Sequence, residues 1–461
     1  MSILGAIIVP HPPVILPAVG KGREQEIAAT STAYRQAAQL VSRWQPDALV
    51  ILSPHATAYR DHFHLSPGTQ AHGDMAQFGA AKLRLETAYD TALTAEIARQ
   101  AEAMSLSAGT RGERMRELDH GTMIPLYFLQ EAGLHCPIVR IGLSGLSPLA
   151  HYQLGECIAS AAQQLDRRVA IIASGDLSHK LTADGPYGFA PQGPEFDHQV
   201  TEAMASGDFF TFLQLNDGFC SAAAQCGLGA FQIMAGTLDG QAVHAQLLSY
   251  EGPFGVGYAV AAFTPQGRDQ TRHFAQRYAA EEAERLTRSQ QAEDHYVKLA
   301  RLSLETFVRT GQRAVLPDDL PAEMTDRAAG VFVSLHKAGG LRGCIGTIAP
   351  TTASIAQEIL QNAISAGTRD PRFPRVQPEE LAQLEYSVDV LNAPEPITSP
   401  DQLDVRRYGV IVSSGSRRGL LLPNLEGVDT ISQQIDIARQ KAGISPRESY
   451  TLQRFEVVRH T

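Results

Sequence analysis

The stretch IIVPHPPVILP, residues Ile7–Pro17, joins an apolar run to a histidine that is held among three prolines. The apolar run starts at Ile3 and is continuous rather than alternating, which is typical of a strand buried on both faces of a parallel sheet. Pro12 disfavours the helical conformation for His11 and keeps that residue extended. The sequence therefore predicts a buried strand that ends at a rigidly held imidazole.

Three more apolar runs in the first half of the chain have the same character. They are 48–52 (ALVIL), 137–143 (PIVRIGL) and 169–173 (VAIIA), and the run GVGYAVAAF over 255–263 would close the sheet. Between the first two strands, 23–44 carries apolar residues at helical spacing. This alternation of strands and helices predicts an α/β N-terminal domain with a largely parallel central sheet.

The length of 461 residues accommodates two or three domains. Residues 266–290 are charged and poor in large apolar side chains, so we predict a charged helical linker there. After it come a helix, the strand GVFVSLHK, the glycine-punctuated turn GGLRGCIG, a second helix and the strand YSVDVL. We therefore predict a first domain over 1–265 and a smaller α+β domain over 291–461.

Composition excludes several classes of protein. The chain is 44% hydrophobic and 19% charged, as in folded globular proteins, and its net charge of -10 argues against a nucleic-acid partner. The five cysteines are scattered without a CxxC pair, which indicates a reducing compartment. No basic segment precedes the first apolar run and no run approaches the length of a membrane span. We expect a cytoplasmic protein without a membrane partner.

Four histidines lie just past predicted strands or at a helix start. His11, His55 (in SPHA) and His179 (in SGDLSH) follow strands, and His120 follows Asp119, a candidate helix N-cap. The carboxyl ends of parallel strands meet at one edge of a sheet, where ligands bind. The four histidines therefore predict a shared functional site, and a metal would suit it because neutral imidazoles bind Fe, Zn, Cu or Ni. The alternative for each one is a structural loop histidine.

We expect a different role for three neighbouring histidines. His62, His64 and His72 fall in a polar segment after the second strand, and we predict solvated loop residues there.

The third metal ligand is harder to predict. Cys226 precedes Gly227 at the start of an apolar, Gly/Ala-rich segment that we predict to be a helix. A helix N-terminus lowers the pKa of a thiol and favours the thiolate that binds metals. A free cysteine is also often a small buried hydrophobe, so both interpretations stay open from the residues alone.

The ordered set VPHPP, SPHA, DHG, SGDLSH and GVGYAVA resembles the class III extradiol dioxygenase superfamily, which includes the Memo-like proteins. The resemblance implies that His11 and His55 bind non-haem Fe(II). It also implies that His179 is the acid–base group of the catechol hydroxyl and that His120 contacts dioxygen or substrate.

The resemblance also bears on the third ligand. Where extradiol enzymes carry a glutamate, this chain reads AAAQCG, and Memo-like members carry a cysteine followed by glycine. The resemblance therefore implies Cys226 as the third ligand. Fe(II) is the expected metal, with Zn or Cu as alternatives.

The second domain resembles the AMMECR family through LRGCIG (341–346) and RDPRF (369–373). Its candidate site comprises Cys344 as a nucleophile, Arg342 or Arg372 as the group that holds a carboxylate or phosphate, and Asp370. The alternative is a structural turn with a buried cysteine. The fusion resembles the AmmeMemoRadiSam group, which implies a radical-SAM protein partner, and we also expect a homodimer.

Three functions follow from these patterns. The leading hypothesis is a non-haem iron enzyme acting on a phenolic, catecholic or related small aromatic molecule, with ring cleavage by dioxygen as one outcome. The second is an oxygen-independent, metal-assisted hydrolase or C–C lyase, which the missing glutamate favours. The third is a non-catalytic metal-binding interaction protein, which would have no need of an acid–base group such as His179.

Overall fold

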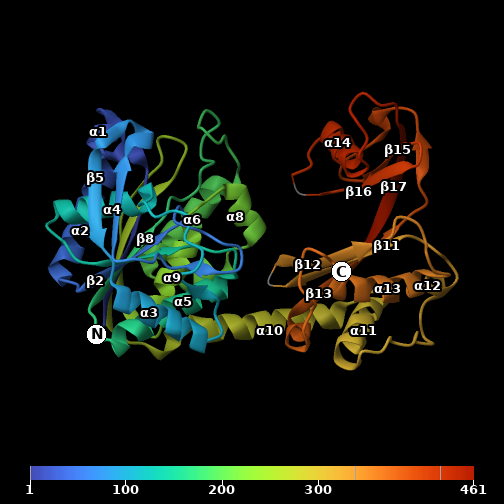
Figure 1. The fold of residues 1–461 in the computed structure, drawn as a ribbon, viewed down its shortest axis with the longest axis horizontal. Coiled ribbons are helices and arrows are strands. Elements are labelled where there is room, and N and C mark those ends of the chain that lie inside the picture. Colours follow the sequence, from blue (N-terminus) through green and yellow to red (C-terminus); the bar gives the residue numbers. More distant parts are fainter. Residues whose placement is uncertain (1, 338, 426) are drawn as a thin grey trace. The chain divides into compact units, whose positions relative to one another are not determined.

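The computed structural model describes residues 2–337, 339–425 and 427–461 of the chain (Figure 1). The chain divides into two compact units, Met1–Glu282 and Ala283–Thr461. The segment predicted as a linker, 266–290, contains the end of strand β10 (Tyr258–Arg268) and most of helix α10 (Phe274–Ala292). The sequence boundary between the two units lies within this helix.

The first unit is built on a six-stranded sheet in the order β7-β2-β8-β1-β10-β9. Its inner strands β1, β2, β7 and β8 are parallel, as continuous burial on both faces requires. The strands are β1 (Ile3–Val9), β2 (Ala48–Ser53), β7 (Ile138–Gly142), β8 (Val169–Ser174), β9 (Gln241–Glu251) and β10 (Tyr258–Arg268). The predicted fold class, an α/β domain with a largely parallel sheet, is confirmed.

Two hydrophobic cores cover the two faces of this sheet. On one face, Ile7 and Val9 of β1 pack with helices α2 (Ala28–Trp44) and α4 (His120–Glu131). On the other, Ile8 and its neighbours pack with several helices (Figure 1). These helices are α3 (Thr91–Ala103), α5 (Pro148–Gln164), α6 (Gln192–Ser206), α7 (Phe210–Gln214), α8 (Asp217–Ala223) and α9 (Leu228–Thr237). The three layers leave the carboxyl ends of the parallel strands as an edge where loops meet.

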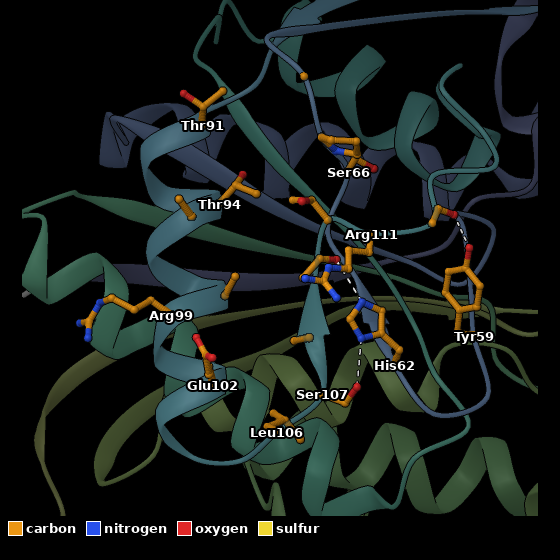
Figure 2. Close-up of a pocket in the computed structure, with 18 of the residues that line it drawn as sticks. Tyr59, His62, Ser66, Thr91, Thr94, Arg99, Glu102, Leu106, Ser107 and Arg111 are labelled. Atoms are coloured by element: carbon orange, nitrogen blue, oxygen red, sulfur yellow. Dashed lines mark hydrogen bonds between the residues drawn. The ribbon is translucent and has the colours of Figure 1, made fainter.

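The predicted closing strand is present as β10, which runs antiparallel to β1. Its partner β9 was not predicted, because the sequence of β9 alternates and lacks a long apolar run. His64 is fully buried in the short strand β3 (Phe63–His64), so its prediction as a solvated loop residue was wrong. His72 is exposed in β4 (Gln70–Met75), and His62 is half-buried beside Ser107 (Figure 2).

The second unit is an antiparallel sheet with helices, which confirms the predicted α+β class. The strand order is β12-β11-β13-β17-β15-β16, and the short β14 (Glu395–Ile397) pairs with β17. The other strands are β11 (Val331–Lys337), β12 (Gly340–Gly346), β13 (Leu384–Leu391), β15 (Tyr408–Ser414), β16 (Arg417–Leu421) and β17 (Thr451–His460). The helices are α11 (His295–Thr310), α12 (Ala322–Thr325), α13 (Ile355–Thr368) and α14 (Ile431–Lys441).

The segment GGLRGCIG is a strand rather than the predicted turn. It forms β12, which pairs along its length with β11. A side chain at Gly343 would collide with the carbonyl of Ala366 at 2.3 Å, so this glycine lets the strand pass close to α13. The glycines therefore serve close packing of the strand as well as turning.

Candidate metal centre

Three side chains from separate segments of the first unit converge past the carboxyl ends of the parallel strands. His11 follows β1, His55 follows β2, and Cys226 lies just before α9. The Nε2 atoms of His11 and His55 are 3.0 Å apart, and the Sγ atom of Cys226 is 3.7 Å from Nε2 of His11. All three potential ligand atoms lie within 4.8 Å of one another.

This spacing suits a single metal ion. Two nitrogens that are each about 2.1 Å from one ion lie roughly 3 Å apart, and a thiolate bound at about 2.3 Å lies slightly farther from them. Two imidazoles and one sulfur leave open coordination positions for a substrate. The three donors predicted from the sequence are thus brought together at a distance that a transition metal bridges.

His11 is held by two groups at the end of β8. Its Nδ1 atom is 3.0 Å from the hydroxyl oxygen of Ser174, and its backbone N–H donates to the carboxylate of Asp176 at 2.8 Å. The bond at Nδ1 leaves Nε2 turned toward His55 and Cys226. A hydrogen bond of this kind at the second ring nitrogen is what orients metal-binding histidines in proteins.

Cys226 reaches the site because two backbones touch. A Cβ atom added to Gly175 would lie 2.2 Å from Cα of Gly227, and one added to Gly227 would lie 3.0 Å from Cα of Gly175. Only glycine at both positions lets the turn after β8 and the start of α9 approach this closely. The approach brings Sγ of Cys226 to 3.7 Å from the carbonyl oxygen of Asp176.

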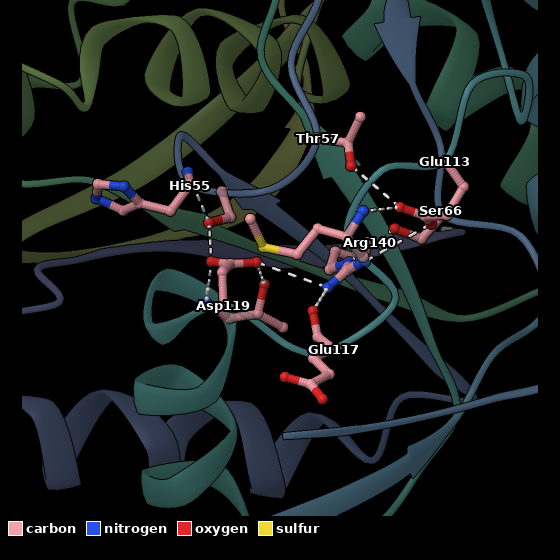
Figure 3. Close-up of polar contacts among 10 residues, drawn as sticks. His55, Thr57, Ser66, Glu113, Glu117, Asp119 and Arg140 are labelled. Carbon is pink, nitrogen blue, oxygen red and sulfur yellow. Dashed lines mark hydrogen bonds and ion pairs between the residues drawn. The ribbon is translucent and has the colours of Figure 1, made fainter. Parts of the chain in front are cut away.

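One carboxylate fixes both His55 and His120. Asp119 is the N-cap of α4, and its Oδ1 accepts the backbone N–H of Thr122 at 3.0 Å. The same oxygen accepts the hydroxyl of Ser53 at 2.5 Å, and Ser53 Oγ in turn accepts the backbone N–H of His55 at 3.2 Å (Figure 3). The cap predicted at Asp119 is present, and it also orders the turn after β2.

Arg140 of β7 completes this network from a fully buried position. Its guanidinium lies 3.7 Å from Asp119 and 3.8 Å from Glu113, so the buried cation has two carboxylates near it (Figure 3). It also donates to the backbone carbonyls of Met115 at 2.6 Å and Glu117 at 2.7 Å. Arg140 therefore holds the segment that leads into His120.

His120 and His179 line the cavity in front of the three donors. This cavity has a volume of about 740 Å³, and His11, His55 and Asp176 also line it. The ring centroid of His120 is 4.1 Å from that of His55. The Nε2 atom of His179 is buried and has no hydrogen-bond partner among the described residues, so it is available to a ligand in the cavity.

Aromatic side chains form part of the wall of the same cavity. The Phe78 ring lies 5.3 Å from His120, and the Tyr187 ring lies 5.1 Å from His179 with an interplanar angle of 31°. Phe254 and Tyr258 line it as well. Such walls suit a planar, partly apolar ligand.

Burial sets the protonation of the donors. It lowers the pKa of His11 to about 3, with the neighbouring His55 adding to the effect, and it lowers the pKa of His120 to about 3. It also lowers the pKa values of His55 and His179, so these imidazoles are neutral at pH 7. Neutral imidazole is the form that binds metals or accepts a proton.

The thiol of Cys226 behaves differently from the sequence expectation. We predicted that a helix N-terminus would lower its pKa, but burial raises the pKa well above the usual value, and the Asp176 carboxylate adds to the shift. The apolar surroundings outweigh the field of the helix end, so the thiol keeps its proton unless a cation replaces it.

The candidate residues of the second unit lie in two groups. The backbone N–H of Cys344 donates to Asp370 at 2.9 Å, and Arg372 binds the same carboxylate at 3.0 and 2.7 Å. Arg342 instead donates to both oxygens of a different carboxylate, that of Glu380, at 2.9 Å each. Both guanidinium groups therefore engage carboxylates of their own domain.

Two family models match the two parts of the chain. Residues 5–261 match the family model "Catalytic LigB subunit of aromatic ring-opening dioxygenase". The chain belongs to the LigB family. Residues 297–460 match the AMMECR1 model, so the protein is a LigB domain fused to an AMMECR1 domain. The predicted family resemblance is confirmed for both domains.

Relatives share the same organisation or one part of it. The protein CA_C1420 of Clostridium acetobutylicum is 38% identical over all of this chain and 99% of its own length. A Thermotoga maritima protein is 50% identical over 36% of this chain and 98% of its own length. The crystal structure of the uncharacterized protein PH0010 from Pyrococcus horikoshii is 33% identical, covers 36% of this chain and 88% of that one, and has a TM-score of 0.34.

Sequence reasoning missed the residues that orient the donors. Ser53 and Ser174 are strand-end serines with no distinctive pattern. Arg140 did leave a signal, because a charged residue inside the apolar run PIVRIGL indicates a buried ion that needs partners.

Among the described residues, no helix is long and apolar enough to cross a membrane.

A first prediction concerns the buried cation. Replacing Arg140 with methionine leaves the Asp119 carboxylate buried without its cation. We expect the free energy of unfolding of the LigB domain to fall by about 3–5 kcal/mol. Trp44, the single tryptophan, lies in this domain, so urea unfolding followed by its fluorescence measures the loss.

The control for this prediction is Arg35→Met. Arg35 pairs with Glu131 at 3.3 Å with both side chains 44% exposed, so its loss should cost less than about 1 kcal/mol. Equal losses in the two variants would contradict the importance of the buried pair.

A second prediction concerns pH. A metal held by Cys226 would bind its thiolate, so binding would release one proton. The apparent affinity should then rise about tenfold per pH unit below the raised thiol pKa. His11 does not oppose this trend near neutrality, because its pKa is about 3. Co(II) titrations of the metal-free protein at pH 6.5 and 7.5 would measure the slope, and Cys226→Ala should remove it. A slope that persists in the variant would show that the proton comes from another group.

Proposed function

We propose that this protein is a non-haem iron enzyme that acts on a phenolic or related small aromatic molecule. The observation that supports it best is the convergence of His11, His55 and Cys226 within 4.8 Å at the sheet edge of a LigB domain. Fe(II) is the proposed metal because two imidazoles with one anionic ligand leave positions open for substrate. A bound Fe(II) would polarise a phenolate and bring it together with dioxygen.

The surrounding residues suit the handling of such a substrate. The aromatic side chains Phe78 and Tyr187 would bracket a planar ring. His179 is neutral at pH 7 and its Nε2 atom has no hydrogen-bond partner among the described residues, so it would take the proton of the phenolic hydroxyl. His120, also neutral, would donate or accept a hydrogen bond at the opposite wall. The radical-SAM partner stays a prediction from the family resemblance.

A second candidate is oxygen-independent, metal-assisted hydrolysis or C–C bond cleavage. The observation that favours it is the thiol of Cys226 in place of a carboxylate. A thiolate changes the electronics of the metal and is itself open to oxidation by dioxygen. The same His179 would serve as the base in either reaction.

The metal proposal predicts that His11→Ala and Cys226→Ala each lose most of the bound metal. Protein purified without oxygen would be analysed for iron, zinc and copper by mass spectrometry. His72→Ala is the matched control, because His72 is exposed in the β4 strand outside the cavity and should leave the metal content unchanged. Unchanged metal in both His11 and Cys226 variants would refute the ligand assignment.

The base proposal predicts a selective effect of His179→Gln. We expect this variant to retain its metal while turnover of an active catechol falls about 10²- to 10⁴-fold, because one proton-transfer group is lost. Screening catechols by oxygen uptake and ultraviolet absorption separates the two candidates: uptake supports the dioxygenase, and product without uptake supports the hydrolase or lyase. If His179→Gln turns over substrate at the wild-type rate, the protein does not use this residue as a base.

A further inference from the structure

The LigB domain contains a second, larger cavity that shares no lining residue with the one at the metal centre. Its volume is about 1160 Å³, which is large enough for a small organic molecule. Helix α3 forms one wall, and residues 105–112 form the rest together with Tyr59, His62 and residues 66–68 (Figure 2). Nothing in the proposed reaction uses this cavity.

One arginine of the cavity lining has no ion-pair partner among the described residues, although Glu102 also lines the cavity. Arg111 lines the cavity, and no hydrogen bond or ion pair joins its guanidinium to another described residue. The other arginine of the wall, Arg99, is already bound to Glu96 at 2.5 Å. A free guanidinium is the group that binds carboxylates and phosphates through two parallel hydrogen bonds.

The position of Arg111 is central rather than peripheral. Figure 2 shows its side chain beside His62, in the space between α3 and the opposite wall. The His62 ring is fixed on both sides, with Nδ1 3.0 Å from Ser107 Oγ and Nε2 3.3 Å from the carbonyl oxygen of Gly109. Since its own nitrogens are engaged, His62 supports the wall and leaves ligand binding to Arg111.

The rest of the lining suits an organic body. Ala95, Ala98 and Leu106 offer apolar surface, and Tyr59 also lines the cavity. Thr91 adds a hydroxyl near the start of α3. A ligand with a single acidic group and a small apolar or aromatic body would satisfy both kinds of surface.

We propose that this cavity is a binding site for a small organic acid, a carboxylate or a phosphate ester, anchored by Arg111. The site would also act on the metal centre, a consequence that rests on the proposed function. Residues 105–112 continue directly into the segment that Arg140 holds at Met115 and Glu117 and that ends at His120. Arg140 also donates to Ser66, another residue of the cavity wall, at 2.7 Å.

Calorimetric titration of the full, metal-free chain with benzoate and, separately, with phenyl phosphate tests the site. We expect saturable binding of at least one probe, and the probe that binds identifies the acidic group. Arg111→Gln should weaken binding at least about tenfold, since a charge-assisted bidentate contact is lost. Ala95→Phe, which fills the cavity without touching the charge, should weaken it comparably. Hydrogen exchange should slow in residues 105–118 when the probe binds.

Arg116→Gln is the matched control, because Arg116 is exposed in the same segment and does not line the cavity. It should bind the probe as the wild type does. Absence of saturable binding for both probes, wild-type affinity in Arg111→Gln, or an equal loss in Arg116→Gln would each overturn the proposal. The titration uses no metal, so its outcome is independent of the metal analysis that tests the proposed function.

Discussion

The carboxylate of Asp119 is the constraint on which the metal centre depends. A parallel sheet brings strand ends to one edge, but it does not decide where the side chains beyond those ends point. Asp119 does so for two of the histidines, because it accepts hydrogen bonds from Ser53 beside His55 and from the first turn of the helix that begins at His120. A carboxylate this deeply buried needs a cation nearby, and Arg140 supplies it from the neighbouring strand.

The protonation states of the candidate donors suit a bound cation. Burial keeps His11 and His55 neutral, which makes their ring nitrogens available to a metal without competition from protons near pH 7. The same burial opposes ionisation of Cys226, so a thiolate there is stable only beside a positive charge. A divalent cation would bind the two neutral imidazole nitrogens and replace the proton of the thiol. The close contact between Gly175 and Gly227 brings the Cys226 thiol near the imidazoles, where a cation would replace its proton.

The sequence predicted what depends on local pattern and missed what depends on distant partners. Continuous apolar runs located the four parallel strands within one residue at each end, and the histidines that follow three of them pointed to the shared edge. Strand β9 and the strand at LRGCIG were not predicted, because the alternating sequence of β9 and the glycine content of LRGCIG suggested other structures. The contact between Arg140 and Ser66 spans 74 residues, and no spacing rule reveals such a pair. The sign of the Cys226 pKa shift depends on burial, which the order of residues near a helix start does not give.

Arg140 links a wall residue of the larger cavity to the segment before His120. Its Nε atom is bonded to Ser66 in the wall of the larger cavity, and its two terminal nitrogens are bonded to carbonyls of the segment that precedes His120. A fully buried guanidinium has few alternative partners, so these bonds are costly to break one at a time. A movement of Ser66 in the cavity wall would therefore also displace the segment before His120. A candidate site in which Asp119 orders both His55 and His120 would be sensitive to such a displacement, because one oxygen of Asp119 accepts both the hydroxyl of Ser53 and the backbone N–H of Thr122.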